Sequence, residues 1–161
     1  MRPFDSKMAY VVTHCFLQRI WERKKYDDLV VLLDGMCLSF DGERSMDPAL
    51  VDDWAKATAS KVSFTKREGF DAARTFLRYW DEIGPGEEIK SIIHSMETSR
   101  GGEPVRQEIA ELWNSCWDEV SANLDAGDPF KTSFCYGINE QGKTGRLQRN
   151  AKTGFHEFVE D

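Results

Sequence analysis

TKREGFDAARTFLRYW, residues 65–80, carries the pattern that decides the fold. Thr65 and Glu68 are spaced as in a capping box, in which the two side chains satisfy free backbone N–H groups at the start of a helix. Hydrophobic side chains then recur every three or four residues, at Phe70, Ala73, Phe76, Leu77 and Trp80. The stretch therefore predicts an amphipathic helix with one buried face.

Similar patterns, with start and stop residues, recur along the first 126 residues. The run from Met8 to about Lys25 has a hydrophobic face and a basic end, which complements the helix dipole. Asp47-Pro48 places an N-cap acid before a proline, and Gly35 is expected to end the preceding helix. We expect helices at about 8–25, 27–35, 48–60, 65–83, 87–96 and 104–124.

The last part of the chain has a different character. After Gly127 come short runs rich in β-forming residues, separated by glycine-containing turns: 132–138, 146–149 and 155–159. We therefore expect a mainly α protein, a helical bundle of about six helices with a small C-terminal β hairpin or three-stranded sheet. The length suits a single domain, 1–161, with a bundle at 1–126 and a β-rich tail packed on it at 127–161.

Residues 9–36 echo residues 69–96 at an offset of 60 positions. The pairs include Phe16-Leu17 with Phe76-Leu77, Asp27-Asp28 with Glu87-Glu88, and Met36 with Met96. Two interpretations stay open. The chain contains an internal duplication that packs as a pseudo-symmetric bundle, or the periodicity of any two amphipathic helix pairs produces the match.

Composition and charge narrow the class of protein. No apolar run approaches the roughly 18 residues of a membrane span, and the N-terminus lacks the features of a signal peptide, so we expect a cytoplasmic protein without membrane contact. The net charge of −7 argues against direct nucleic-acid binding. Acids crowd residues 27–53, where Arg44 is the only base, and residues 101–130, where Arg106 is the only base.

No cofactor or metal is expected. The four cysteines, Cys15, Cys37, Cys116 and Cys135, form no C-x-x-C pair, which is the pattern of reduced thiols, and the scattered histidines add no zinc-ligand spacing. An EF-hand is excluded because placing Gly42 or Gly35 at the loop's glycine position puts Cys37 or Val30 at its first ligand position.

Residues 137–144, GINEQGKT, match the P-loop pattern G-x-x-x-x-G-K-[ST]. A P-loop needs a helix directly after it and further parallel strands, whereas here Gly145 follows and the chain soon ends. We interpret the string as a hairpin turn. The alternative is a nucleotide- or phosphate-binding enzyme built around Lys143 and Thr144.

Other candidate chemistry lacks a local signature. Cys15 or Cys37 with His94 as base gives no recognisable nucleophile motif, so we expect no enzyme. Trp113 and Trp117, one helical turn apart, are interpreted as core rather than as a stacking platform. His14, in an apolar helix, is interpreted as a structural histidine.

Two acids are not explained by helix starts and turns. Asp34 falls in the last turn of its expected helix, where a negative charge opposes the dipole at a cost of about 0.3–1 kcal/mol, and Glu43 has no capping role. They belong either to a solvated face or to a partner-binding patch.

Two stretches carry a family resemblance: YDDLVVLLDGMCLSFDGERSMDPALVDDWAKA, residues 26–57, and FTKREGFDAARTFLRYWDEIGPGEEIKSIIHSM, residues 64–96. The pattern is a helix with Phe-Leu, a short Leu-Leu helix, and then Asp41-Gly42, Asp47-Pro48-Ala49 and Asp53-Trp54. Over residues 9–96 the chain resembles small bacterial immunity proteins of contact-dependent growth inhibition and related polymorphic toxin systems. It departs from the pattern at Val51, where an aromatic residue is expected, and the tail from 104 has no counterpart.

The resemblance implies a non-enzymatic inhibitor that binds one cognate toxin domain and masks its active site. Many toxins of this class are nucleases with basic clefts, and an acidic face would speed encounter with such a cleft. A protein adaptor with some other protein partner would look the same in sequence. We expect the interface to contain Asp34, Asp41, Glu43, Asp52, Asp53, Glu111, Asp118 and Glu119.

Overall fold

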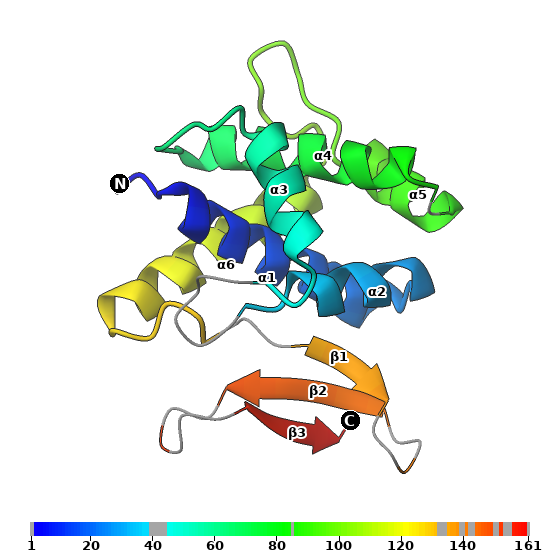
Figure 1. The fold of residues 1–161 in the computed structure, drawn as a ribbon. Coiled ribbons are helices and arrows are strands. Elements are labelled where there is room, and N and C mark those ends of the chain that lie inside the picture. The colour runs from blue at the N-terminus through cyan, green and yellow to red at the C-terminus, as the bar shows by residue number, and fades with distance from the viewer. Residues whose placement is uncertain are drawn as a thin grey trace.

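The chain is mainly helical in this computed structural model (Figure 1). The structure describes residues 2–38, 45–84 and 86–131 and, largely as backbone alone, 135–138, 141, 144–149, 152 and 156–160. Among these residues there are six helices: α1 Ser6–Lys24, α2 Asp27–Met36, α3 Pro48–Ala57, α4 Lys66–Glu82, α5 Glu87–Ser95 and α6 Gln107–Asp125. The expectation of a mainly α fold with about six helices is confirmed.

The C-terminal segment contains β1 Cys135–Ile138, β2 Thr144–Arg149 and β3 His156–Glu160. They pair antiparallel in the order β1-β2-β3, with Ile138 opposite Thr144. β1 packs against α2, and Figure 1 shows the sheet on the side of the helical body opposite α4.

The starts of α3 and α4 are set by side chains that the sequence identifies. Thr65 Oγ1 accepts a hydrogen bond from the Glu68 N–H at 3.3 Å, and Glu68 Oε2 accepts one from the Thr65 N–H at 2.8 Å. Asp47 Oδ1 accepts from the Ala49 N–H at 3.0 Å, with Pro48 as the first residue of α3. The predicted capping box and the predicted N-cap are both present.

Two predicted helix boundaries are wrong because contacts from elsewhere in the chain override them. Gly35 lies inside α2, where a Cβ would come within 2.6 Å of Leu50 Cδ1, so this glycine allows α2 and α3 to pack closely. α6 begins at Gln107 rather than at Pro104, because Pro104 forms a β bridge with Thr98.

The six helices form two repeated units, α1–α3 and α4–α6. The helices of the first unit start at residues 6, 27 and 48, and those of the second at 66, 87 and 107. The indole N–H of Trp54 on α3 donates to the Ser6 carbonyl at 3.2 Å, and that of Trp113 on α6 donates to the Lys66 carbonyl at 2.9 Å. Hydrophobic periodicity alone does not require the same indole–carbonyl bond in both units, so the structure favours an internal duplication.

A pseudo-two-fold axis relates the two units. The Phe4 N–H donates to the Phe64 carbonyl at 2.9 Å, and the Phe64 N–H donates to the Phe4 carbonyl at 2.8 Å. Between the units, α1 contacts α4, α2 contacts α5, α6 packs on α1 and α3 packs on α4. The third helix of each unit therefore covers the first helix of the other unit, and α1 lies at the centre in Figure 1.

The core forms where the units meet. Every residue of α1 from Met8 to Gln18 is buried. The rings of Phe16, Phe70 and Trp113 pack edge to face with centroids 5.4–6.3 Å apart. Trp117 stacks on the ring of Phe4 at 4.4 Å. Both tryptophans of α6 are core residues, as predicted.

Gly69 lies against these two indoles. A Cβ at this position would be 2.8 Å from Trp117 Cζ3 and 3.2 Å from Trp113 Cζ2. We expect Gly69→Ala to lower the free energy of unfolding by about 1–3 kcal/mol, because the packed indoles cannot yield without repacking the core. Urea denaturation measures this loss. Gly101→Ala is the control, since the nearest atom there is Ser99 Oγ at 3.8 Å, and equal losses in both variants would contradict the explanation.

His14 is buried in the centre of α1, with 1% of its surface exposed. Burial lowers the pKa of His14 from 6.5 to about 4, and the nearby backbone of Leu33 offsets only part of this shift. The unfolded chain therefore binds a proton at a higher pH than the folded chain does. Stability is complete above pH 6.5 and is lost as the pH falls from there towards 4.

We expect the wild type to lose about 2 kcal/mol more stability than His14→Gln between pH 7 and pH 5, because the glutamine variant has no proton to take up at this position. Urea denaturation at the two pH values gives the comparison. The carboxylates titrate in both proteins, so their contribution cancels. Parallel pH profiles would show that His14 is not buried in its neutral form.

Candidate protein-binding surface

Some of the acids predicted to form an interface lie on α2 and α3. Asp34 is half-buried near the end of α2. On α3, Asp52 is exposed, whereas Asp53 is half-buried and its Oδ1 lies 3.8 Å from Lys56 Nζ. The remaining two of this group, Asp41 and Glu43, lie outside the described residues.

The other predicted acids are on α6, and two of them are already paired with neighbouring helices. Arg19 Nη2 donates to both carboxylate oxygens of Glu119, at 3.1 and 2.9 Å. Lys66 Nζ lies 2.8 Å from Asp118 Oδ1. Glu111 is exposed and accepts a hydrogen bond within α6. These ion pairs connect α6 to α1 and α4, which is a structural role.

A different acidic surface forms where the first turns of α2 and α5 meet the end of α4. A shallow hollow of about 320 Å³ there is lined by Asp27, Asp28, Val31, Trp80 and Ile83, which we call the Trp80 surface. Val31 and Ile83 are 66% and 68% exposed, and Trp80 is only partly buried against the core. Hydrophobic side chains that face solvent within a charged rim are typical of protein-binding sites.

The carboxylates around the Trp80 surface gather there because helix starts favour negative charge. Asp27 and Asp28 lie in the first turn of α2, and Glu87 and Glu88 lie in the first turn of α5. The positive end of each helix dipole stabilises them. Neither Asp27 nor Asp28 caps α2, because Tyr26 occupies the N-cap position.

The two helix starts approach each other closely. The Asp28 N–H donates to Glu88 Oε1 at 3.3 Å, and these two residues are equivalent in the repeat. Gly86 allows the start of α5 to lie this close to α2, since a Cβ at residue 86 would be 3.0 Å from Asp28 Oδ2. At the margin, Lys90 Nζ lies 3.8 Å from Glu87 Oε1 and balances part of the negative charge.

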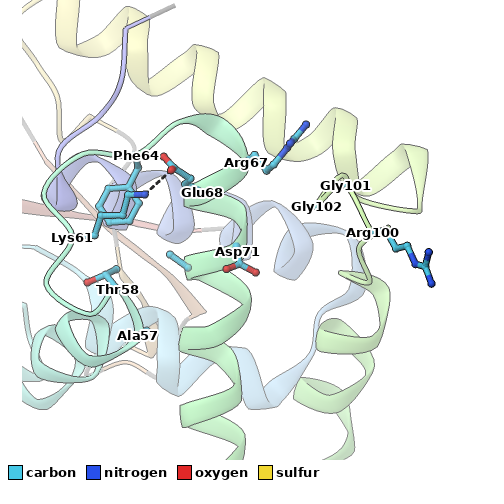
Figure 2. Close-up of a pocket in the computed structure, with 11 residues that line it drawn as sticks. Ala57, Thr58, Lys61, Phe64, Arg67, Glu68, Asp71, Arg100, Gly101 and Gly102 are labelled. Carbon is cyan, nitrogen blue, oxygen red and sulfur yellow. Dashed lines mark hydrogen bonds and ion pairs between the residues drawn. The ribbon is translucent and has the colours of Figure 1, made fainter.

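A second hollow, of about 420 Å³, lies between the end of α3, the start of α4 and the loop at 100–102 (Figure 2). Figure 2 shows Lys61 beside the ring of Phe64, with its ammonium group directed at Glu68. The ammonium group of Lys61 and the Thr65 N–H together hold the pKa of Glu68 down at about 2. Glu68 therefore stays ionised and does not serve as a proton donor near neutral pH.

The remaining charges of this hollow do not converge on a common point. Arg67 pairs with Glu103, and Figure 2 shows Arg67 and Arg100 projecting away from Lys61. Glu68 also belongs to the capping box of α4. The charged side chains of this hollow thus hold the α3–α4 connection in place, through the Lys61–Glu68 ion pair and the capping box, and do not form a binding site.

The cysteines have structural environments. Cys15 and Cys116 are free and buried. The neighbouring Cys116 and burial raise the pKa of Cys15 far above its usual value, so this thiol stays protonated and unreactive. Cys37 is disulfide-bonded, so the expectation of a reduced thiol is wrong there. Cys37 directly follows α2, which packs against β1, and this packing is not evident from the sequence spacing of the cysteines.

The P-loop string lies between two antiparallel strands. β1 ends at Ile138 and β2 begins at Thr144 directly opposite it. A P-loop would need a helix at Thr144, with its N-terminal N–H groups bound to phosphate, and residues 144–149 form a strand instead. Lys143, together with Asn139, Glu140 and Gly142, lies outside the described residues.

Within the described ranges, no group of three or more potential metal-binding side chains is present. None of the helices in these ranges combines the length and hydrophobicity needed to cross a bilayer. Comparison of the chain with protein-family models, with curated proteins and with solved structures gives no match. A function for this chain is therefore inferred from the surfaces of the molecule.

We expect Cys15 and Cys116 to resist alkylation by iodoacetamide in the folded protein and to react fully in 6 M guanidinium, because both thiols are buried and Cys15 is protonated. Mass spectrometry of the peptides that contain each residue measures the modified fraction. Rapid alkylation of either thiol in the folded protein would reopen the possibility of a cysteine nucleophile.

Proposed function

We propose that this chain is an immunity protein, a non-enzymatic inhibitor that binds a cognate toxin domain and masks its active site. The observation that carries the proposal is the Trp80 surface, with Val31, Trp80 and Ile83 at its centre and carboxylates at its rim. In protein interfaces, a few large hydrophobic or aromatic side chains supply most of the binding energy. The resemblance of residues 9–96 to immunity proteins supports the same class of function.

The rim favours a basic partner. Asp27 and Glu87 are exposed, and the contact between Asp28 and Glu88 brings two further acids together. Arginine or lysine side chains of a partner would form charge-assisted hydrogen bonds with this group and would also speed association. A nuclease toxin with a basic cleft has this chemistry.

The position of the rim favours tight binding. Its acids lie in the first turns of α2 and α5, not in long loops, so little conformational entropy is lost when a partner binds. Elsewhere, by contrast, Asp118 and Glu119 are engaged with cations of the same chain.

The test compares two exposed valines. Val31 belongs to the Trp80 surface, whereas Val62, 80% exposed, lies in the connection between α3 and α4. With the toxin domain encoded beside the gene, we expect Val31→Lys to weaken binding by about 30-fold or more and to abolish protection of growing cells. Val62→Lys should behave as the wild type. Calorimetry gives the affinities, and undiminished binding by Val31→Lys would refute the role of the Trp80 surface.

A further variant locates the interface if it lies elsewhere. Asp52→Lys changes an exposed acid of α3, which belongs to the interface expected from sequence. Loss of binding with Asp52→Lys, combined with full binding by Val31→Lys, would move the interface to α3 and keep the toxin as partner. The absence of any binding to the toxin domain by the wild type would refute the proposed function itself.

A further inference from the structure

A pocket of about 440 Å³ opens between the end of α1, the outer face of α5 and the start of α6. Its lining includes Arg23, Lys24 and Arg106, and the described residues contain no ion-pair partner for any of the three. Glu108 is the carboxylate in the lining. The pocket is therefore net positive in a chain whose net charge is −7.

The floor of the pocket is hydrophobic. Ile20, Ile109 and Leu112 lie there with 6%, 9% and 7% of their surfaces exposed, whereas most of the core is below 3%. Ser91 and His94 of α5 add polar groups to the lining. A ligand in this pocket would meet cations on one side and hydrophobic side chains on the other.

The repeat shows that the fold does not require these cations. At the equivalent place in the first unit, Asp47 caps α3 with its carboxylate. In the second unit Arg106 occupies the N-cap of α6, where a positive charge opposes the helix dipole at a cost of about 0.3–1 kcal/mol. Arg23 complements the dipole at the end of α1 but corresponds to the uncharged Ile83, so the repeated unit forms without it. Arg106 breaks a local rule without local gain, as is expected where a ligand binds.

The start of α6 also leaves backbone donors for a ligand. The first backbone hydrogen bond of this helix runs from the Ala110 N–H to the Arg106 carbonyl at 3.1 Å. The N–H groups of Gln107, Glu108 and Ile109 precede it, and within the described residues no side chain caps them. Such groups are suited to donating hydrogen bonds to a bound anion.

We propose that this pocket binds a small organic anion, a phosphate or carboxylate that carries a hydrophobic group. The anionic group lies between Arg23, Lys24 and Arg106, and the hydrophobic group lies on the floor. The volume is within the roughly 300–1,000 Å³ of small-molecule pockets.

The probes are octyl phosphate and octanoate, with octyltrimethylammonium as the matched cation. Calorimetry should give a dissociation constant below about 1 mM for at least one of the two anions and no binding of the cation. The stronger of the two anions identifies the preferred headgroup. Inorganic phosphate, which has no hydrophobic group, should bind at least about tenfold more weakly than octyl phosphate if octyl phosphate is the ligand that binds.

Arg106→Gln and Arg23→Gln should each weaken anion binding by about tenfold, because each removes a charge-assisted hydrogen bond. Arg78→Gln is the control, since Arg78 is exposed on α4 and does not line the pocket. Circular dichroism checks that the variants are folded. The proposal is overturned if neither anion binds, if the cation binds equally well, or if both pocket variants keep wild-type affinity.

Discussion

The fold depends on reciprocal helix packing between its two units, α1–α3 and α4–α6. The third helix of each unit packs on the first helix of the other, and the reciprocal backbone bonds of Phe4 and Phe64 tie the two units at their axis. Burial of α1 on all sides follows from this arrangement, as does the buried position of His14. The aromatic cluster of Phe16, Phe70 and Trp113 draws one ring from each of α1, α4 and α6, so the core belongs to neither unit alone.

The two equivalent places where the first helix of one unit lies beside the second helix of the other differ in charge. Where the end of α4 meets α2, Ile83 and Val31 form a hydrophobic centre among acids. Where the end of α1 meets α5, the corresponding positions are Arg23 and Ser91, and cations line a pocket. Since the backbone is repeated, the difference comes from the side chains alone. On this basis we propose different ligands for the two sites, a basic protein at the first and a small anion at the second.

Local signals in the sequence were reliable, and signals that depend on distant contacts were not. The capping box of Thr65 and the N-cap Asp47 involve neighbours in sequence, so both could be predicted. Gly35 was interpreted as a helix stop because nothing local shows that Leu50 packs against it. The Trp80 surface combines Val31 with Ile83, which are 52 positions apart, and only the packing of α2 on α5 brings them together. Asp27 and Asp28 belong to the acidic run at 27–53, but nothing in the sequence shows that the start of α5 lies beside them.

The exchanged third helices have an evolutionary consequence. A single three-helix unit would expose the hydrophobic surface of its first helix, which in this chain is covered by the other unit, whereas a homodimer of such units would bury that surface by the same exchange of third helices. Fusion of two such copies into one polypeptide frees each half from the requirement of symmetry. One unit can then carry an arginine where the other unit carries an aspartate, as at Arg106 and Asp47, while both units keep the same arrangement of helices.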